Sequence, residues 1–524
     1  MPTANLRTRL VELEAAIVEQ KGVLAALERD KIAVQQELDD TATFPILTLP
    51  VEITTEIFTW CLPTIQELRR DHRLFGSEDE ELGPGTLQAP LSLASCCRAW
   101  RAIALATPHL WTTFPLFLEA DSGDLDSDSD ESDVGDLDVD GTAKPKREHL
   151  TKFIDRWLGR AAQRPLTFVF SIAAPGPQHN YRGPACTSLH HVKDLMKRYA
   201  LQLEHFDLTA SFRNAYSLVN SEVKFPLLQR VVLAGFPDDE YYIPDPIDLF
   251  PTGAPQFREL FLRDTDMIQV YPIALSCYYF PFDQLTRFEG RIDELLLFGR
   301  GSNLIEVKCY FDPGEADFED SEKITLLNLR SLTLSSPDSD ATSFLLGQLT
   351  LPALLSLHLS GADPTDPISI GSLLKRSNPP LRSLSVRVDH DQFDPWDHCF
   401  AAVGPTLETL EIHSASSSFM NHVLSSSHPA LPQLKSLTLL DCPGVNYENL
   451  TAFLYRRSTS SALAKLQYFR LIHSPGTLVD ENLFHIHGDD VNRTVSDHAH
   501  ELGRHGMNIH IGSKTKTLIS IGST

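Results

Sequence analysis

A spaced leucine pattern recurs from residue 203 to residue 471 and constrains the fold of the chain more than any other feature. The pattern is Leu-x-x-Leu-x-Leu with conservative replacements, and its eleven copies begin on average about 26 residues apart. The copies begin at Leu203, Leu228, Phe257, Leu285, Leu304, Leu329, Leu354, Leu381, Leu407, Leu434 and Leu466. In each copy the last two apolar residues alternate with polar ones, as on a strand with one buried face. One copy cannot bury its own leucines, so the pattern predicts a stack of repeats that cover one another.

Helix-like stretches lie between the later copies, at 343–349, 368–376, 418–426 and 447–457. The sequence therefore predicts an α/β solenoid of short parallel strands and helices over 148–475, followed by a polar C-terminal tail at 476–524. This region resembles the leucine-rich-repeat proteins. Those repeats commonly carry Asn or Cys three residues after the last leucine, and only Cys442 fits here. We therefore expect an irregular solenoid, with a different α/β fold as the alternative; the copy at Leu285 is degenerate, because Gly290 replaces its last apolar residue.

Three short amphipathic segments precede the repeats, within 45–115. The first reads Leu-Pro-x-Glu-Ile-x-x-x-Ile-Phe at 49–58, the second Leu-x-x-x-Cys-Arg-x-Trp-Arg at 93–101, and the third Thr-Pro-x-Leu-Trp at 107–111. Pro50 suits the start of a helix, because its missing N–H is not needed there. So small a helical domain buries only a limited fraction of its surface. Its apolar residues are too many for that interior, and an exposed apolar surface typically marks a protein partner.

These three segments, in this order, resemble the F-box, a module that docks its protein onto the Skp-family adaptor of a cullin–RING (SCF) ubiquitin ligase. The resemblance implies adaptor binding through Leu49, Pro50, Ile53, Ile57, Phe58, Leu93, Trp100 and Trp111. The chain departs from the pattern in an insertion at 63–90, which carries the acidic run 78–81. The alternative is an ordinary helical hairpin in which every Trp and Leu belongs to the core.

A heptad pattern runs through 5–40. Leu6, Leu13, Gln20, Leu27 and Val34 share one position, and Leu10, Ile17, Leu24, Lys31 and Leu38 share the other. Alternating steps of four and three residues are typical of a coiled-coil seam. The pattern predicts a coiled-coil helix and a homodimer through 5–40. The alternative is a single helix that packs back on the chain or frays in solution.

Composition narrows the class of protein. The net charge of −25 argues against a nucleic-acid partner, because phosphate contacts need a basic surface. Residues 119–140 hold eleven acidic residues and no Lys or Arg, and 119–147 is expected to be an acidic disordered linker. No CxxC pair occurs among the eight cysteines, which predicts neither a zinc site nor a disulfide framework. No apolar run is long enough to span a membrane, so we expect a cytoplasmic or nuclear protein without a membrane partner.

The sequence carries no recognisable catalytic motif. The pairs His190-His191, His485-x-His487 and His498-x-His500 lack a third metal ligand at matching spacing, and no P-loop or Gly-x-Ser-x-Gly element occurs. We therefore expect no enzyme activity, no cofactor and no metal.

The open face of the repeat strands is the more informative surface, because the curvature of a solenoid creates extended binding surfaces. The substrate-face candidates on it are Thr333, His358, Ser385, Arg387, Glu411, His413, Thr438, Tyr468 and Arg470. The alternative is that this face is only solvated and that binding uses loops or the tail. The leading hypothesis is a non-catalytic substrate-recognition subunit of an SCF ubiquitin ligase, with an unknown protein substrate. The second is a repeat scaffold that assembles partners without ubiquitin transfer.

Overall fold

The computed structural model describes most of the chain between residues 2 and 521. The described residues are 2–41, 46–65, 67–68, 88–118, 143–172, 189–211, 223–236, 247–248, 253–264, 278–279, 281–292, 296–312, 323–361, 363–388, 393–425, 431–442, 445, 447–461, 463–473, 500–504, 506–513 and 517–521. The predicted acidic linker up to residue 142, the acidic run 78–81 and the histidines at 485, 487 and 498 lie outside these residues. Contacts divide the chain into two compact units, Met1–Thr64 with Pro84–Trp111 and Ile65–Gly83 with Thr112–Thr524.

The first unit is helical. Its elements are α1 (Pro2–Thr41), the 3-10 turn η1 (Ile46–Thr48), α2 (Val51–Trp60), α4 (Gln88–Cys96), α5 (Arg98–Ala106) and the 3-10 turn η4 (Pro108–Trp111). Pro50 lies just before α2 as its N-cap, and its carbonyl accepts from the backbone N–H of Thr54 at 3.0 Å. The N-cap of α5 is Cys97, whose Sγ accepts from the Trp100 N–H at 3.4 Å. Helices are therefore confirmed in the three predicted segments and in 5–40.

The second unit is built on one long sheet, which in the described residues has fifteen strands in the order β1-β2-β3-β4-β6-β8-β9-β11-β13-β14-β15-β16-β17-β18-β19. Every neighbouring pair is parallel except β18 with β19. The strands are β1 (Thr113–Leu118), β2 (Leu166–Ile172), β3 (Leu203–Ser211), β4 (Arg230–Phe236), β6 (Glu259–Asp264), β8 (Arg287–Ile292), β9 (Glu306–Phe311), β11 (Ser331–Ser336), β13 (Ser356–Gly361), β14 (Ser383–Arg387), β15 (Thr409–His413), β16 (Ser436–Leu440), β17 (Tyr468–His473), β18 (Asn508–Ser513) and β19 (Thr517–Ile521). Two-residue strands form two further pairs, β5 (Ile247–Asp248) with β7 (Tyr278–Tyr279) and β10 (Ile324–Thr325) with β12 (Leu349–Thr350).

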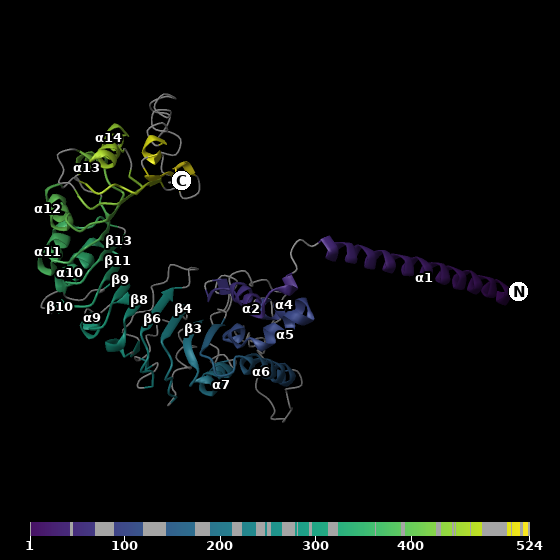
Figure 1. The fold of residues 1–524 in the computed structure, drawn as a ribbon. Helices are drawn as coiled ribbons and strands as arrows, with labels where there is room; N and C mark the ends of the chain where they lie inside the picture. The colour runs from purple at the N-terminus through teal and green to yellow at the C-terminus, as the bar shows by residue number, and fades with distance from the viewer. Residues whose placement is uncertain are drawn as a thin grey trace. The chain divides into compact units, whose positions relative to one another are not determined.

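Helices connect many of these strands. They are α6 (Ala143–Arg160), α7 (Leu189–Tyr199), α9 (Leu296–Arg300), α10 (Ser339–Gln348), α11 (Pro367–Ser377), α12 (Phe393–Val403), α13 (Ser417–Leu424) and α14 (Tyr447–Thr459). Consecutive helices contact one another, α10 with α11, α11 with α12 and α13 with α14. Figure 1 shows α10, α11 and α12 along one side of the neighbouring strands, so the other side of those strands is left open.

The eleven leucine copies each begin just before, or in one case at, a strand of this sheet, which confirms the mixed α/β prediction. Their apolar residues form the core: Leu332 and Leu357, which pair across β11 and β13, are both 0% exposed. Close packing explains the glycine at position 290 of the degenerate copy, because a β-carbon there would lie 2.8 Å from the Leu262 Cβ. Cys442 connects neighbouring repeats, since its Sγ donates to the Ile412 carbonyl of the preceding repeat at 3.6 Å.

The sheet extends past both ends that we expected. β1 pairs with β2 before the predicted start at 148, and β18 and β19 lie in the segment that we expected to be a polar tail. Residues 143–147, which we assigned to the disordered linker, form the first turns of α6. The tail was misassigned because β18 carries only the short alternation Ile509 and Ile511, with Gly506 at the position of the leading leucine.

Candidate protein-binding surfaces

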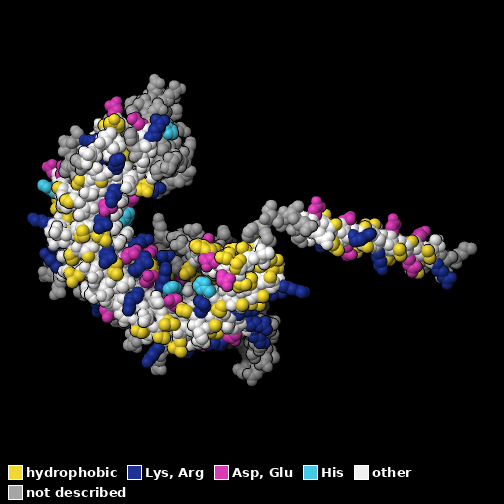
Figure 2. All heavy atoms as spheres, in the orientation of Figure 1, with side chains coloured by type: hydrophobic (Ala, Val, Ile, Leu, Met, Phe, Trp, Pro, Cys, Tyr) yellow, Lys and Arg dark blue, Asp and Glu magenta, His cyan; other side chains and the backbone are white. Residues whose placement is uncertain are grey.

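Helix α2 has two apolar faces, one exposed to water and the other buried. Ile53, Ile57 and Trp60, spaced four and three residues apart, lie on one face of the helix and are 49%, 38% and 81% exposed. Phe58, on the other face, is 0% exposed, and its ring meets the Trp100 ring edge-on with centroids 5.0 Å apart. Figure 2 shows hydrophobic side chains gathered over the helical unit. We call Ile53, Ile57 and Trp60 the α2 outer face.

Three of the eight predicted adaptor-binding residues require a correction. Phe58, Leu93 and Trp111 are buried, so their side chains belong to the interior of the protein. The Trp111 indole N–H donates to the Ala104 carbonyl at 2.9 Å, which ties η4 to α5. Sequence periodicity alone did not reveal which side of each short helix faces inward.

The remaining predicted residues stay accessible. Pro50, Ile53 and Ile57 are exposed, and Leu49 and Trp100 are partly so. The sequence reasoning missed Trp60, and it also missed Leu47 and Val51, which are 63% and 56% exposed. Trp60 follows Ile57 by three residues, so the helical spacing could have identified it.

Strand register brings most of the predicted substrate-face residues into rows. Thr333, His358, Ser385, Glu411, Thr438 and Arg470 are successive partners across β11, β13, β14, β15, β16 and β17. Arg387 pairs with His413 in the row two residues further along, and Tyr468 lies two residues before Arg470. Ser385 and Thr438 are only 6% and 8% exposed, so these two candidates contribute little surface. Tyr468, in contrast, is 50% exposed.

Four of these residues form one polar cluster, which we call the Glu411 cluster. The Glu411 Oε1 accepts from the Ser385 hydroxyl at 2.9 Å and lies 2.8 Å from His413 Nε2 and 4.0 Å from His358 Nδ1. The hydrogen bond from His413 holds the pKa of Glu411 below its usual value, and Ser385 acts in the same direction. Burial lowers the pKa of His358.

The Glu411 cluster suits binding rather than acyl transfer. In a nucleophile–base–acid relay the acid and the nucleophile contact opposite nitrogens of the imidazole. Here a single nitrogen of His413 faces both the Glu411 carboxylate at 2.8 Å and the Ser385 hydroxyl at 3.3 Å. The Ser385 hydroxyl also donates directly to the carboxylate instead of to a base. These contacts fix the side chains in place on the open face.

The earlier strands carry a ladder of alternating charge that the sequence reasoning did not single out. Arg230, Glu259, Arg287 and Glu306 are successive partners across β4, β6, β8 and β9. Their charged atoms lie 3.8, 3.5 and 3.0 Å apart along the row. The Arg230 guanidinium also lies 4.5 Å from the centroid of the Phe261 ring. Each ladder residue follows the first apolar residue of its copy by two positions, so an alignment of the copies would have revealed the alternation.

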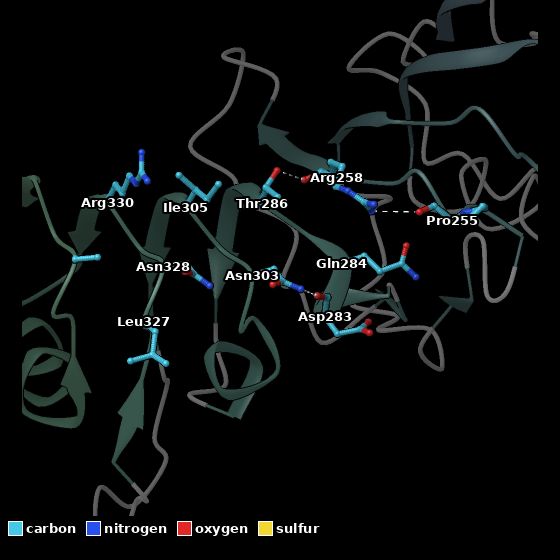
Figure 3. Close-up of a pocket in the computed structure, with 11 residues that line it drawn as sticks. Pro255, Arg258, Asp283, Gln284, Thr286, Asn303, Ile305, Leu327, Asn328 and Arg330 are labelled. Carbon is cyan, nitrogen blue, oxygen red and sulfur yellow. Dashed lines mark hydrogen bonds between the residues drawn. The ribbon is translucent and has the colours of Figure 1, made fainter.

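A polar pocket of about 750 Å³ lies where strands β6, β8, β9 and β11 begin, as Figure 3 shows. Its side chains brace one repeat against the next. The Asn303 Nδ2 donates to the Asp283 carbonyl at 2.7 Å, and the Asn328 Nδ2 donates to the Ser302 carbonyl at 3.1 Å. The Thr286 hydroxyl donates to the Arg258 carbonyl at 3.2 Å. The amide and hydroxyl side chains at this edge of the sheet therefore stabilise the contacts between neighbouring repeats.

The fold and surfaces together define a mixed α/β protein with a long parallel repeat sheet and a helical unit that exposes apolar side chains. No protein-family model matches the chain, and no curated protein matches it significantly. None of the helices in the described part of the chain is both long and apolar enough to span a membrane. Within the described residues, no three His, Cys, Asp or Glu side chains lie close enough together to hold a metal ion.

Proposed function

We propose that the chain is the substrate-recognition subunit of an SCF-type cullin–RING ubiquitin ligase. The helical unit docks on a Skp-family adaptor, and the open face of the repeat sheet holds a protein substrate. The motif resemblance in 49–111 suggests this function, and the geometry of α2 supports it.

The observation that carries the proposal is the α2 outer face. A helix of ten residues needs only one apolar side to pack within its own domain, and Phe58 provides it here. Ile53, Ile57 and Trp60 add a second apolar side that water reaches. Burial of a large apolar side chain contributes roughly 1.5–3 kcal/mol, so a groove that covers these three residues gains several kcal/mol. Exposed apolar surface of this kind favours a protein partner.

The substrate surface in this proposal is the later half of the open face. Tyr468 and Arg470 are exposed there, and Arg387 and His413 are partly so. Tyr and Arg are the residue types that most often dominate protein interfaces. The Glu411 cluster lies in the same rows and supplies fixed polar groups that a protein segment can contact.

The contribution of such a subunit is proximity. It holds a substrate lysine near a thioester-carrying enzyme that belongs to other subunits, which raises the effective concentration of the two reactants. The chain itself makes and breaks no bonds in this scheme.

Co-purification with the adaptor tests the proposal. The wild-type chain is expected to retain a Skp-family adaptor, and an Ile53→Asp/Ile57→Asp variant is expected to lose it, because two carboxylates on the α2 outer face cannot be buried without a large desolvation cost. Ile368→Asp is the matched control, since Ile368 lies on α11 and is 62% exposed. Absence of the adaptor from the wild type, or its retention by the double variant, contradicts the proposal. Partners recovered without the adaptor would favour the scaffold function.

A further inference from the structure

Helix α1 exposes an apolar seam along most of its length. The described apolar members of the seam are 53–63% exposed and are Leu10, Leu13, Ile17, Leu24, Leu27, Val34 and Leu38. They are separated by steps of three and four residues, with Gln20 and Lys31 at the two polar positions. Helix α1 is 40 residues long, and a seam of this kind is the surface that a second helix covers in a coiled coil.

We propose that α1 is the interface of a parallel, in-register, two-stranded homodimer of this chain. The occupant of the seam is therefore a second copy of α1. The charges beside the seam, and the two polar residues within it, carry this assignment. The inference is independent of the proposed ligase function.

The charges that flank the seam favour parallel helices. Leu10, Ile17, Leu24, Lys31 and Leu38 share one of the two seam positions. In a parallel in-register pair, the residue just before each of them faces the residue five positions later on the other helix. Arg9 then faces the partner's Glu14, and the symmetry of the dimer makes this contact twice. Three further contacts of this kind each pair one charged with one uncharged residue, namely Ala16 with the partner's Lys21, Val23 with the partner's Glu28 and Asp30 with the partner's Gln35. These flanking contacts therefore bring no like charges together.

An antiparallel pair is less favourable. With the seams aligned, Arg9 faces the partner's Glu37, but Glu14 faces the partner's Glu28 and Lys21 faces the partner's Lys21. Like charges at these positions repel, so the repulsive contacts oppose the attractive one. The flanking residues therefore select the parallel orientation.

The polar seam residues fix the register. In register, Gln20 faces the partner's Gln20, and each amide can donate to the other's carbonyl oxygen. A shift of one heptad would place Gln20 against the partner's Leu13 or Leu27 and leave its amide without a partner in an apolar seam. In the same register Lys31 faces the partner's Lys31. A lone Lys at a seam position specifies register and oligomeric state, and the repulsion between the two ammonium groups is its cost in stability. Two copies joined in this way present two repeat faces, which increases avidity for a repeated or dimeric substrate.

Mass measurement of the full chain tests the seam. By light scattering after size exclusion, the wild type is expected to have the mass of two chains instead of 58.5 kDa. Leu24→Asp should give the monomer mass, because it places a carboxylate in each half of the seam. Val18→Asp is the matched control: Val18 lies on α1, is 69% exposed and falls outside the seam, so this variant should stay dimeric. A monomeric wild type, a trimer, or a dimer that survives Leu24→Asp overturns the proposal.

A charge swap and a cross-link test the orientation. Arg9→Glu and Glu14→Arg should each raise the dimer Kd, about two- to thirtyfold for two exposed ion pairs, and the double swap should restore it. Gln20→Cys should form an intermolecular disulfide under mild oxidation, whereas Val18→Cys should match the wild-type background set by the exposed Cys61 and Cys96. No rescue by the double swap, or no cross-link above background at Gln20→Cys, overturns the parallel register.

Discussion

Truncation of Phe58 separates the packing face of α2 from its outer face. Phe58 is 0% exposed and touches Trp100, so Phe58→Ala removes a full aromatic side chain from a closed interior. Such changes cost about 3–5 kcal/mol, a large part of the stability of a small unit. Ile53→Ala removes a side chain that is already 49% exposed, so its cost should be about 1 kcal/mol.

Urea unfolding followed by tryptophan fluorescence measures both changes. Three of the five tryptophans, Trp60, Trp100 and Trp111, lie in the helical unit, so its transition is visible in the emission. The free energies follow from the midpoint and slope of that transition. Adaptor binding should weaken in Ile53→Ala although the helical unit stays folded, and in Phe58→Ala only as the unit unfolds. A cost below about 1 kcal/mol for Phe58→Ala, or equal costs for both variants, would refute the assignment of the two faces.

Three further predictions concern the repeat sheet. Arg376→Met should destabilise the repeats by about 1.5–3 kcal/mol in urea unfolding, because the guanidinium donates to the Leu346 carbonyl at 2.7 Å. Lys375→Met is the control and should cost little stability, because Lys375 is an exposed neighbour. Gly290→Ala should lower the free energy of unfolding by about 1–3 kcal/mol, because the added methyl group crowds Leu262. Gly347→Ala should raise it by about 0.5–1 kcal/mol, because Gly347 has open space around it in α10, and the reverse order would contradict the packing. Burial lowers the pKa of His358, so on acidification the unfolded chain takes up the imidazole proton before the folded chain does. The stability that His358 contributes is therefore complete above pH 6.5 and falls as the pH is lowered. Between pH 7.5 and 5.5 the free energy of unfolding of His358→Asn should fall less than that of the wild type, and an equal fall in both would contradict this.

The repeat sheet was largely predictable, because its signal is physical and repeated. Each copy needs two inward apolar residues on a strand, and stacking forces every strand into the same register. The leucine spacing alone therefore placed Thr333 and His358 at equivalent positions of successive copies, and β11 and β13 pair them. The prediction lost β1 and β18 at the two ends, where the sequence keeps the alternation but not the leading leucine.

The orientation of the short helices could not be predicted from sequence. In α2 the adjacent residues Ile57 and Phe58 are both large and apolar, and periodicity cannot decide which one is buried. The decision depends on Trp100, which lies 42 positions away from Phe58 and meets it only in the folded unit. The braces between repeats were missed for a related reason. Arg376 looks like a surface residue of an amphipathic helix, yet its guanidinium bonds the carbonyl groups that end the preceding helix.

Calorimetric titration of the purified full chain with a purified Skp-family adaptor tests the central claim most directly. Burial of the α2 outer face predicts binding with a negative heat-capacity change, because apolar surface leaves water. The same titration should show no binding for Ile53→Asp/Ile57→Asp and unchanged binding for Ile368→Asp. Absence of heat with the wild type, or equal affinity for the double variant, would contradict the claim that this face docks the chain onto the ligase.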